Sequence, residues 1–461
     1  MLNVQIAPHR EFLPADSSEQ KLFVMLKLRP KKEVANTRPP TTFVFLIDTS
    51  GSMREVIVGD SVPTGNTFTV DGQEYMSVTG GQTKIDIVMQ SLNKLIYSGK
   101  LGGSDRISIV QFDDSASTLI GLTPATQTSQ LESAIDRLRE FSGGTRMGLG
   151  LRQALNLISG QNMTIRRTLL FTDGQTVDED LCRAIASEFA ANNTPITALG
   201  VGEFNENLLT HLSDTTGGIP LHIVTEENQS GAAVSISKLP DTIIQEFSQA
   251  QQEVITNLAL TVKTVQGVKL TRIVRAYPSQ AEFSLTQDPY PIGNAVANDE
   301  TVFILEFSIE SRVASRVRIA QLGLTYDVPG QNRRGELPPA NLLVQFVAGQ
   351  VAAQVDQEVM GYVQQCNISQ LVNEATRLAD RNPQKAEELL ETARRMTVRI
   401  GNDAMTESLN QAQDELRKTR KISDGTRKTV KMGSKGKTVK MGGDINDDEL
   451  SEEQIRKLSG T

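Results

Sequence analysis

Hydrophobic positions between Pro40 and Glu227 follow two alternating patterns, which together predict a layered α/β domain. Runs that are apolar along their length predict buried strands at Phe43–Ile47, Arg106–Phe112, Thr118–Leu122, Thr168–Phe171, Ile196–Val201 and Leu221–Val224. Segments with an apolar residue at every third or fourth position predict amphipathic helices at Thr83–Tyr97, Ser129–Arg139, Met147–Ile158, Val177–Asn192 and Asn205–Ser213. Apolar strands separated by helices are typical of a doubly wound, mostly parallel sheet covered on both faces. The short connection after the second strand predicts an antiparallel hairpin at one edge.

The segments on either side of this block have the pattern of β-strands. Residues 1–39 contain the runs "LNVQIAP" and "KLFVMLKLRP", and residues 250–349 contain several more, separated by Gly, Pro and Asn turns. Neither segment alone would make a stable sheet, so we expect the two to pair into one β-sandwich. The α/β domain at residues 40–249 is then an insertion, which is tolerated where the ends of a domain lie close together.

Beyond the predicted sandwich the pattern becomes helical and then polar. Residues 350–421 predict a small helical bundle, with a break between two helices at the "RNP" of Arg381–Pro383. Residues 422–461 contain few apolar side chains and many Gly, Lys, Ser and Thr, so burial would not offset their ordering entropy and we expect a disordered tail. This tail contains an internal repeat, "RKTVKMG" at Arg427 and "GKTVKMG" at Gly436.

Composition narrows the class of protein. The 461 residues suffice for two or three domains, and no run approaches the roughly 18 apolar residues of a membrane span. The start of the chain lacks the pattern of a signal peptide, which predicts a cytoplasmic location. Cys182 and Cys366 are expected to be free thiols, which fits a reducing compartment. The net charge is −8 although residues 417–440 are strongly basic, so the main body is acidic and unsuited to nucleic acid.

Oxygen-bearing side chains follow two of the buried strands and one loop. The stretch "FVFLIDTSGSM" places Asp48, Ser50 and Ser52 after the first strand, "GGTRMG" places Thr145 before a helix, and "LLFTDG" places Asp173 after another strand. Because ligands bind at the carboxyl ends of the strands of an open α/β sheet, we expect these side chains to converge. Two carboxylates and three hydroxyls suit a hard divalent cation, Mg²⁺ first and Mn²⁺ or Ca²⁺ as alternatives. The hydroxyls leave the charge of such a cation partly unneutralised, so it would accept a carboxylate from outside.

The motifs "DTSGSM", "GGT" and "TDG", in this order, resemble the metal-ion-dependent adhesion site of the von Willebrand factor A-type domain. The resemblance implies that Ser50, Ser52 and Thr145 coordinate the metal directly. It further implies that Asp48 and Asp173 support the metal mainly through water, and that an acidic side chain of a partner completes the octahedron. All five family positions hold the expected residue type, which predicts an intact site. The sandwich with an inserted domain looks like bacterial relatives of the inter-alpha-trypsin-inhibitor heavy chains.

One departure from the family pattern is a long insertion between Met53 and Thr83. Its alternating residues around "DGQ" predict a β-hairpin beside the metal loop. The hairpin is either a solvated ornament or a lid that selects partners. An acid from it (Asp60, Asp71 or Glu74) would make the domain self-inhibited by capping the cation. Outside the insertion, "FDD" at Asp113–Asp114 is expected to be a polar turn and not a further metal ligand.

These features predict a non-enzymatic scaffold protein that binds an acidic residue of a protein partner through a divalent cation. A metal-dependent hydrolase or phosphatase that uses the same site is the competing class, and a structural protein with a vestigial site is a third. Two observations weigh against an enzyme. Ser50 stands where phosphoaspartate enzymes need a second aspartate, and the three histidines are too scattered to provide a general base.

The repeat suggests a second function. Thr429 and Thr438 each lie in Lys-Thr-Val-Lys-Met, and basic flanks suit a Ser/Thr kinase with an acidic substrate groove. A phosphate there would add roughly −1.5 to −2 charges, to which a phosphothreonine-reading domain of the forkhead-associated kind would dock. The alternative is a solubilising, weakly anion-binding tail.

Overall fold

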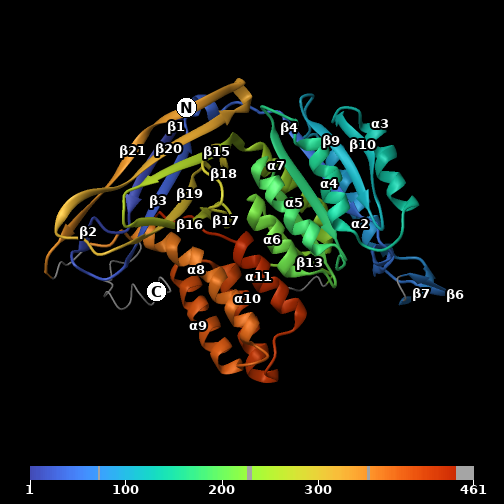
Figure 1. Ribbon diagram of the computed structural model, residues 1–461. Helices are drawn as coiled ribbons and strands as arrows, with labels where there is room; N and C mark the ends of the chain where they lie inside the picture. Colours follow the sequence, from blue (N-terminus) through green and yellow to red (C-terminus); the bar gives the residue numbers. More distant parts are fainter. Residues whose placement is uncertain (71–72, 226–230, 350–353, 443–461) are drawn as a thin grey trace. The chain divides into compact units, whose positions relative to one another are not determined.

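The computed structural model describes residues 1–70, 73–225, 231–349 and 354–442 (Figure 1). These residues divide into two compact units. One unit contains Met1–Thr37 and the chain from Val254 on, and the other contains residues from Arg38 to Glu253 apart from a short stretch at Ala232. The predicted fold class is confirmed: an α/β unit with a mostly parallel sheet interrupts a β-sandwich, and helices follow.

The α/β unit is built on a seven-stranded sheet with the order β10-β9-β4-β11-β12-β13-β14. Its strands are β4 (Thr41–Asp48), β9 (Arg106–Phe112), β10 (Ala116–Pro124), β11 (Ile165–Thr172), β12 (Ile196–Val201), β13 (Pro220–Val224) and β14 (Val234–Ser235). Every neighbouring pair is parallel except β9 and β10, which form the predicted antiparallel edge hairpin. All eight residues of β4 and of β11 are buried, as expected of strands covered on both faces.

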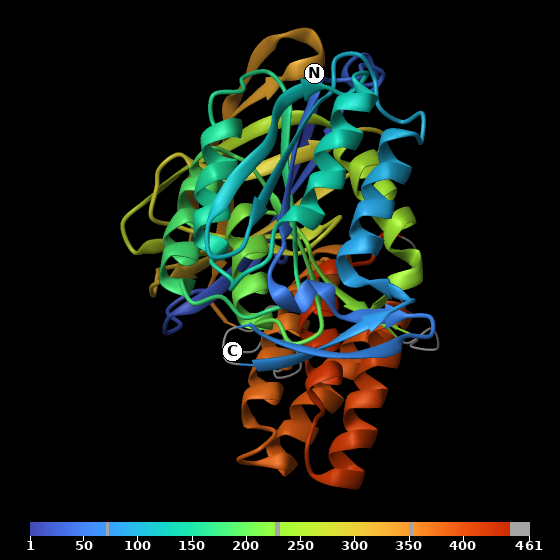
Figure 2. The same cartoon turned by 90° about the vertical axis from the view of Figure 1, so that its right-hand side faces the viewer.

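Helices cover both faces of this sheet (Figure 2). They are α2 (Lys84–Ile96), α3 (Thr128–Asp136), α4 (Met147–Ile158), α5 (Glu179–Ala191), α6 (Glu206–Thr216) and α7 (Leu239–Gln251). Helix α2 packs against α3 and α7 on one face, while α4, α5 and α6 pack in sequence on the other. The hydrophobic pattern did not predict α7 or the two-residue strand β14.

The other unit begins with a β-sandwich of two five-stranded sheets. One sheet contains β1 (Leu2–Pro8), β3 (Gln20–Pro30), β19 (Thr301–Ile309), β16 (Val268–Tyr277) and β17 (Ala281–Phe283). The other contains β18 (Tyr290–Val296), β15 (Glu253–Thr264), β20 (Ser315–Val328), β21 (Arg333–Val347) and β2 (Phe12–Pro14). The N-terminal segment contributes to both sheets, because β3 pairs with β19 and β2 pairs with β21. A single hydrophobic core fills the space between the sheets, with Phe303, Phe307 and Phe346 fully buried.

In the described part of the chain, four helices follow the sandwich: α8 (Gln357–Leu378), α9 (Pro383–Arg399), α10 (Asp403–Thr419) and α11 (Asp424–Gly436). The predicted break lies between α8 and α9. Helix α11 corrects the prediction of disorder from residue 422, which is wrong as far as Gly442; residues 443–461 lie outside the described part of the chain. Composition misled here, because α11 does not form a core of its own. It adds Val430 to the existing core of the bundle, and Lys428 and Lys435 on the same helix are buried as well.

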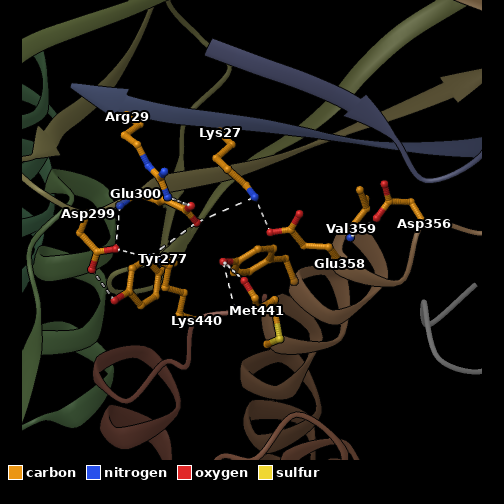
Figure 3. A network of polar contacts seen from close by, with 11 residues as sticks. Lys27, Arg29, Tyr277, Asp299, Glu300, Asp356, Glu358, Val359, Lys440 and Met441 are labelled. Carbon is orange, nitrogen blue, oxygen red and sulfur yellow. Dashed lines mark hydrogen bonds and ion pairs between the residues drawn. The ribbon is translucent and has the colours of Figure 1, made fainter. Parts of the chain in front are cut away.

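The last described residues form a terminal strap, defined here as Lys437–Gly442, which contains the second copy of the repeat. The Met441 side chain joins a cluster with Phe23, Met25 and Tyr362, and its backbone N–H donates to the Tyr362 hydroxyl at 3.1 Å. In Figure 3, Lys440 contacts Asp299 at 2.6 Å, and Glu300 beside it pairs with Arg29 and Lys27 of β3. The two copies of one hexapeptide therefore differ in structure: the first is helical in α11 and the second is an extended strap.

The structure also bears on the predictions about the cysteines and about membrane-spanning segments. Cys182 and Cys366 are free and buried, as predicted. Among the described helices, no segment is long and apolar enough to cross a membrane.

Candidate metal centre

The candidate site lies where β4 and β11 end. These strands are parallel neighbours, with Ile47 opposite Phe171, so Asp48 at the end of β4 and Asp173 just after β11 emerge at the same edge of the sheet. The chain after Asp48 turns into the short 3₁₀ helix η1 (Gly51–Arg54), which brings Ser50 and Ser52 back over that edge. This edge is where open α/β sheets bind ligands.

Asp48 is one of the two buried carboxylates of the site. Its side chain is fully buried, and its carboxylate accepts hydrogen bonds from the Ser50 N–H at 2.8 Å and the Thr172 hydroxyl at 2.6 Å. Burial, together with the negative charge of Asp173, raises the pKa of Asp48 to about 7. Two carboxylates thus lie close enough to repel each other, which is the electrostatic situation that a bound cation relieves.

The hydroxyls of Ser50 and Ser52 connect Asp48 to Asp173. Their Oγ atoms lie 3.2 Å apart, and the Ser52 hydroxyl donates to Asp173 Oδ1 at 2.7 Å. Ser50 and Asp173 are buried whereas Ser52 is half-buried, so the oxygens reach from the interior of the sheet toward the surface.

Thr145 reaches the same place from a third loop. A Cβ added to Gly174 would lie 3.6 Å from Thr145 Oγ1 and 3.9 Å from Ser52 Oγ, so both hydroxyls border Gly174. Hydrogen bonds hold the loop of Thr145 to the other two: Gly51 N–H donates to the Gly143 carbonyl at 3.0 Å, and the Thr176 side-chain hydroxyl donates to the Thr145 carbonyl at 3.1 Å. All five predicted site residues are therefore brought together.

Asp114 has a role that the sequence did not reveal. Asp113 behaves as the expected polar turn, accepting from Ser115, but Asp114 Oδ2 accepts from the Gly144 N–H at 3.0 Å, next to Thr145. A Cβ on Gly143 would lie only 2.6 Å from that same oxygen, so glycine is what lets the loop approach Asp114. Asp114 thus positions the Thr145 loop although it is not itself one of the site oxygens.

We expect Asp114→Ala to weaken divalent-metal binding by roughly 10-fold while leaving the fold intact, because remote groups that orient ligands contribute about this much. Titration of Mn²⁺ followed by calorimetry measures the change. Asp136→Ala, which removes an exposed carboxylate at the end of α3, is the matched control. Equal affinities for the two variants would remove Asp114 from the site.

Lys84 is the second residue whose role the sequence did not reveal. It is the first residue of α2, its side chain is 6% exposed, and its ammonium lies 2.7 Å from Asp173 Oδ2 and 2.6 Å from Glu55 Oε2. Burial alone would lower the pKa of Lys84, but the charges of Asp173 and Glu55 raise it overall. The sequence signal for this role was a lysine at the start of an otherwise apolar helix face. The contact could not be predicted because the long insertion separates Lys84 from the metal loop in the sequence.

The insertion contains the predicted hairpin: β6 (Val62–Val70) pairs antiparallel with β7 (Gln73–Thr79). At its base, β5 (Val56–Val58) pairs with β8 (Gln82–Thr83). Of the acids proposed to cap the cation, Asp60 is exposed. Asp71 and the side chain of Glu74 lie outside the described residues. The capping hypothesis therefore stays a prediction.

The donor chemistry favours an all-oxygen site. Within the described ranges, no three His, Cys, Asp or Glu side chains gather as metal ligands, so the candidate centre depends on two carboxylates aided by hydroxyls. Three hydroxyls and two carboxylates on interlocked loops fit a hard cation such as Mg²⁺, Mn²⁺ or Ca²⁺ better than a soft one.

Comparison with sequence families agrees with this division of the chain. Residues 43–238 match the von Willebrand factor type A domain, and residues 357–440 match the family described as the Sll0103-like C-terminal alpha-helical domain. The second match ends at Lys440 and so includes α11 and most of the strap. The α/β unit thus contains a von Willebrand factor type A domain.

Two relatives have similar sequences. Protein sll0103 of Synechocystis sp. is 23% identical over 351 residues, which cover 73% of this chain and 80% of that protein. Protein YfbK of Escherichia coli is 24% identical over 226 residues, which cover 47% of this chain and 34% of that protein.

Two solved structures share the fold along nearly the whole chain. A von Willebrand factor type A protein from Catenulispora acidiphila has a TM-score of 0.71 at 15% identity and covers 95% of this chain and 97% of its own. The ArnB paralog VWA2 from Sulfolobus acidocaldarius has a TM-score of 0.59 at 13% identity and covers 95% of this chain and 100% of its own. The likeness to inter-alpha-trypsin-inhibitor heavy chains stays a prediction.

Proposed function

We propose that the von Willebrand factor type A domain of this chain, at residues 43–238, holds a divalent cation and through it binds an acidic side chain of a protein partner. Ser50, Ser52 and Thr145 would hold the cation directly, as the family resemblance implies. Asp48 and Asp173 would support it through water. The observation that carries the proposal is the convergence of these five side chains, from three loops, at the edge where β4 and β11 end.

The depth of each group supports this division of roles. Asp48 and Asp173 are buried and held by hydrogen bonds from Thr172, Ser52 and Lys84, so their positions are fixed before a ligand arrives. Ser52 and Thr145 are half-buried and lie on the open side. A bound cation would supply one electrophilic position to an outside carboxylate. Mg²⁺ is the ion we propose, with Mn²⁺ or Ca²⁺ as alternatives.

We also propose that the site is not catalytic. A hydrolase or phosphatase would need a base within reach of an attacking water. Asp48, whose pKa of about 7 would suit that role, is fully buried and already accepts hydrogen bonds from the Ser50 N–H and the Thr172 hydroxyl. The raised pKa of Lys84 disfavours its acting as a base. The other groups described beside Asp48 and Asp173 are hydroxyls and backbone amides. Turnover of phosphoesters or peptides that depends on both Mg²⁺ and Asp173 would overturn this proposal.

A binding experiment with bound Mn²⁺ tests the function. We expect the protein to enhance the proton relaxation of water around Mn²⁺, because exchangeable water would remain on the open position. A short peptide with an amidated C-terminus and one glutamate should reduce that enhancement, and the same peptide with glutamine should not. If both peptides behave alike, the site does not recognise carboxylates. EDTA and the Asp48→Ala variant provide the background.

The strap is the basis of a second, regulatory proposal. The Thr438 hydroxyl donates to the Pro278 carbonyl at 2.6 Å, and Val439 N–H donates to Gln365 at 2.8 Å. A phosphate on Thr438 would replace that hydroxyl with negative oxygens facing the Pro278 carbonyl. We propose that a Ser/Thr kinase thereby releases the strap and exposes it to a phosphothreonine-reading domain. Thr429 is buried in α11, so its phosphorylation would require the helix to open.

We expect a Ser/Thr kinase that prefers basic flanks to label Thr438 and not Thr429 in the folded protein, because Thr438 is half-buried and Thr429 is buried. Mass spectrometry of the labelled peptides distinguishes the two, and protein unfolded in urea should be labelled at both. The Thr438→Glu variant should lower stability by about 1 kcal/mol, the typical contribution of one hydrogen bond. Label at Thr429 alone in the folded protein would contradict the proposal.

A further inference from the structure

A buried lysine bridges the proposed metal centre and the insertion. The Lys84 ammonium lies between Asp173, which is buried, and Glu55, whose side chain is 61% exposed. Backbone contacts fix this position from both sides. Lys84 N–H donates to the Glu55 carbonyl at 3.1 Å, and Val56 pairs with Thr83 in the ladder between β5 and β8. A capping box between Thr83 and Asp86 fixes the start of α2.

The simplest role for such a lysine is to neutralise a buried carboxylate for the sake of the fold. Its place in this site has a second consequence, because Asp173 is also proposed to support a cation. Without Lys84 the buried carboxylates Asp48 and Asp173 would present two negative charges, enough to neutralise a divalent cation alone. With Lys84 they present a net charge of one. A divalent cation then leaves an excess of one positive charge, which an outside carboxylate would balance.

We infer that Lys84 is a tethered cation that lowers the affinity of the site for a metal ion alone and raises the affinity of the metal-loaded site for a carboxylate. This inference rests on the proposed function. Lys84 would make the two ligands bind together: each is favoured when the other is present, and the coupling is equal in both directions because binding free energies are linked. The carboxylate-bearing partner would then be part of what retains the metal.

Glu55, on the solvent side of Lys84, reduces the effect of the lysine charge on metal and carboxylate affinity. Its carboxylate shares the Lys84 ammonium with Asp173 and offsets part of the positive charge, although solvent screens it because it is mostly exposed. Glu55 also gives Lys84 a second partner besides Asp173. Removing the charge of Glu55 should therefore act in the opposite sense to removing that of Lys84.

Two variants with opposite expected effects on Mn²⁺ and acetate affinity test the inference. Lys84→Met keeps an unbranched chain without charge and should bind Mn²⁺ roughly 10-fold more tightly than the wild type, while the Mn²⁺-loaded protein should bind acetate more weakly by a similar factor. Glu55→Gln should bind Mn²⁺ more weakly and acetate more tightly. Lys84→Arg should behave like the wild type. Calorimetry gives the Mn²⁺ affinity, and water proton relaxation of bound Mn²⁺ gives the acetate affinity.

The outcomes separate this inference from the function on which it rests. A purely structural lysine predicts that Lys84→Met lowers the melting temperature and leaves the Mn²⁺ affinity equal or weaker, which would overturn the inference alone. If Lys84→Met does not fold, Glu55→Gln decides: shifts of Mn²⁺ and acetate affinity in the same direction, or none, overturn it. A wild-type protein that takes up no Mn²⁺ overturns both the proposed function and this inference.

Discussion

Replacing Asp48 with asparagine is expected to abolish the stabilisation of the protein by Mg²⁺ or Mn²⁺. The amide keeps the size of the side chain and its acceptor for the Ser50 N–H, so the loop geometry should persist. It removes one of the two carboxylates at the site, which should weaken metal binding by about 100-fold or more. The wild type should gain about 2.7 kcal/mol at 100 times its dissociation constant, seen as a rise of roughly 5–10 °C in melting temperature, and the variant should gain almost nothing.

The metal-free form of this variant should be as stable as the wild type or more stable. Asp48 is buried and lies near the negative charge of Asp173, so a neutral amide removes a repulsion that Lys84 offsets only in part when the metal is absent. Asp136→Asn, an exposed position in the same unit, is the control and should keep the full metal response. Retention of the metal-induced rise by Asp48→Asn would contradict the assignment of the site.

Gly218→Ala is expected to destabilise the α/β unit by about 4 kcal/mol or more, which is exceptional for a single methyl group. A Cβ at this position would overlap the backbone carbonyl of Ile196 at the start of β12, and that backbone is held by the parallel pairing of Ile196 with Thr168. Because a backbone in the middle of a sheet has no room to move aside, the clash must open the connection between α6 and β13. The melting temperature should fall by roughly 8–16 °C, or the variant should not fold.

Gly160→Ala is the matched control for this effect. It adds the same methyl group to the same unit, at an exposed position with nothing within 4 Å of the new atom. Thermal unfolding followed by circular dichroism should therefore give a melting temperature close to that of the wild type. A small effect of Gly218→Ala, comparable to that of Gly160→Ala, would mean that β12 and β13 do not approach as described.

Much of the α/β unit and of the candidate site was predictable because local signals agreed. Apolar runs such as Phe43–Ile47 are long enough to identify parallel strands, and strand ends in such a sheet share one edge. The positions of Asp48 and Asp173 followed from that rule alone. The antiparallel hairpin of β9 and β10 followed from a short connection, and the hairpin of the insertion followed from alternating residues around a turn.

What the sequence did not reveal depends on contacts between distant segments. From the sequence Asp114 looked like a turn residue, because its hydrogen bond from the Gly144 N–H joins two loops that are distant along the chain. Lys84 follows the insertion, so its contact with Asp173 is invisible without the pairing of β5 and β8. Helix α11 has the composition of a disordered segment, and it is ordered because Gly433 lets it approach Ala232 and Met405 of a core that already exists. Composition indicates how much apolar surface a segment can bury by itself. It does not indicate how much the segment can bury against a core formed by other helices.

Calorimetric titration of Mg²⁺ and of Mn²⁺ into the intact, metal-stripped protein tests the central claim most directly. We predict saturable uptake of one ion per chain, lost in Asp48→Asn and retained in Asp136→Asn. No uptake of either ion by the folded wild-type protein, or uptake that survives Asp48→Asn unchanged, would contradict the claim that these three loops form a metal centre.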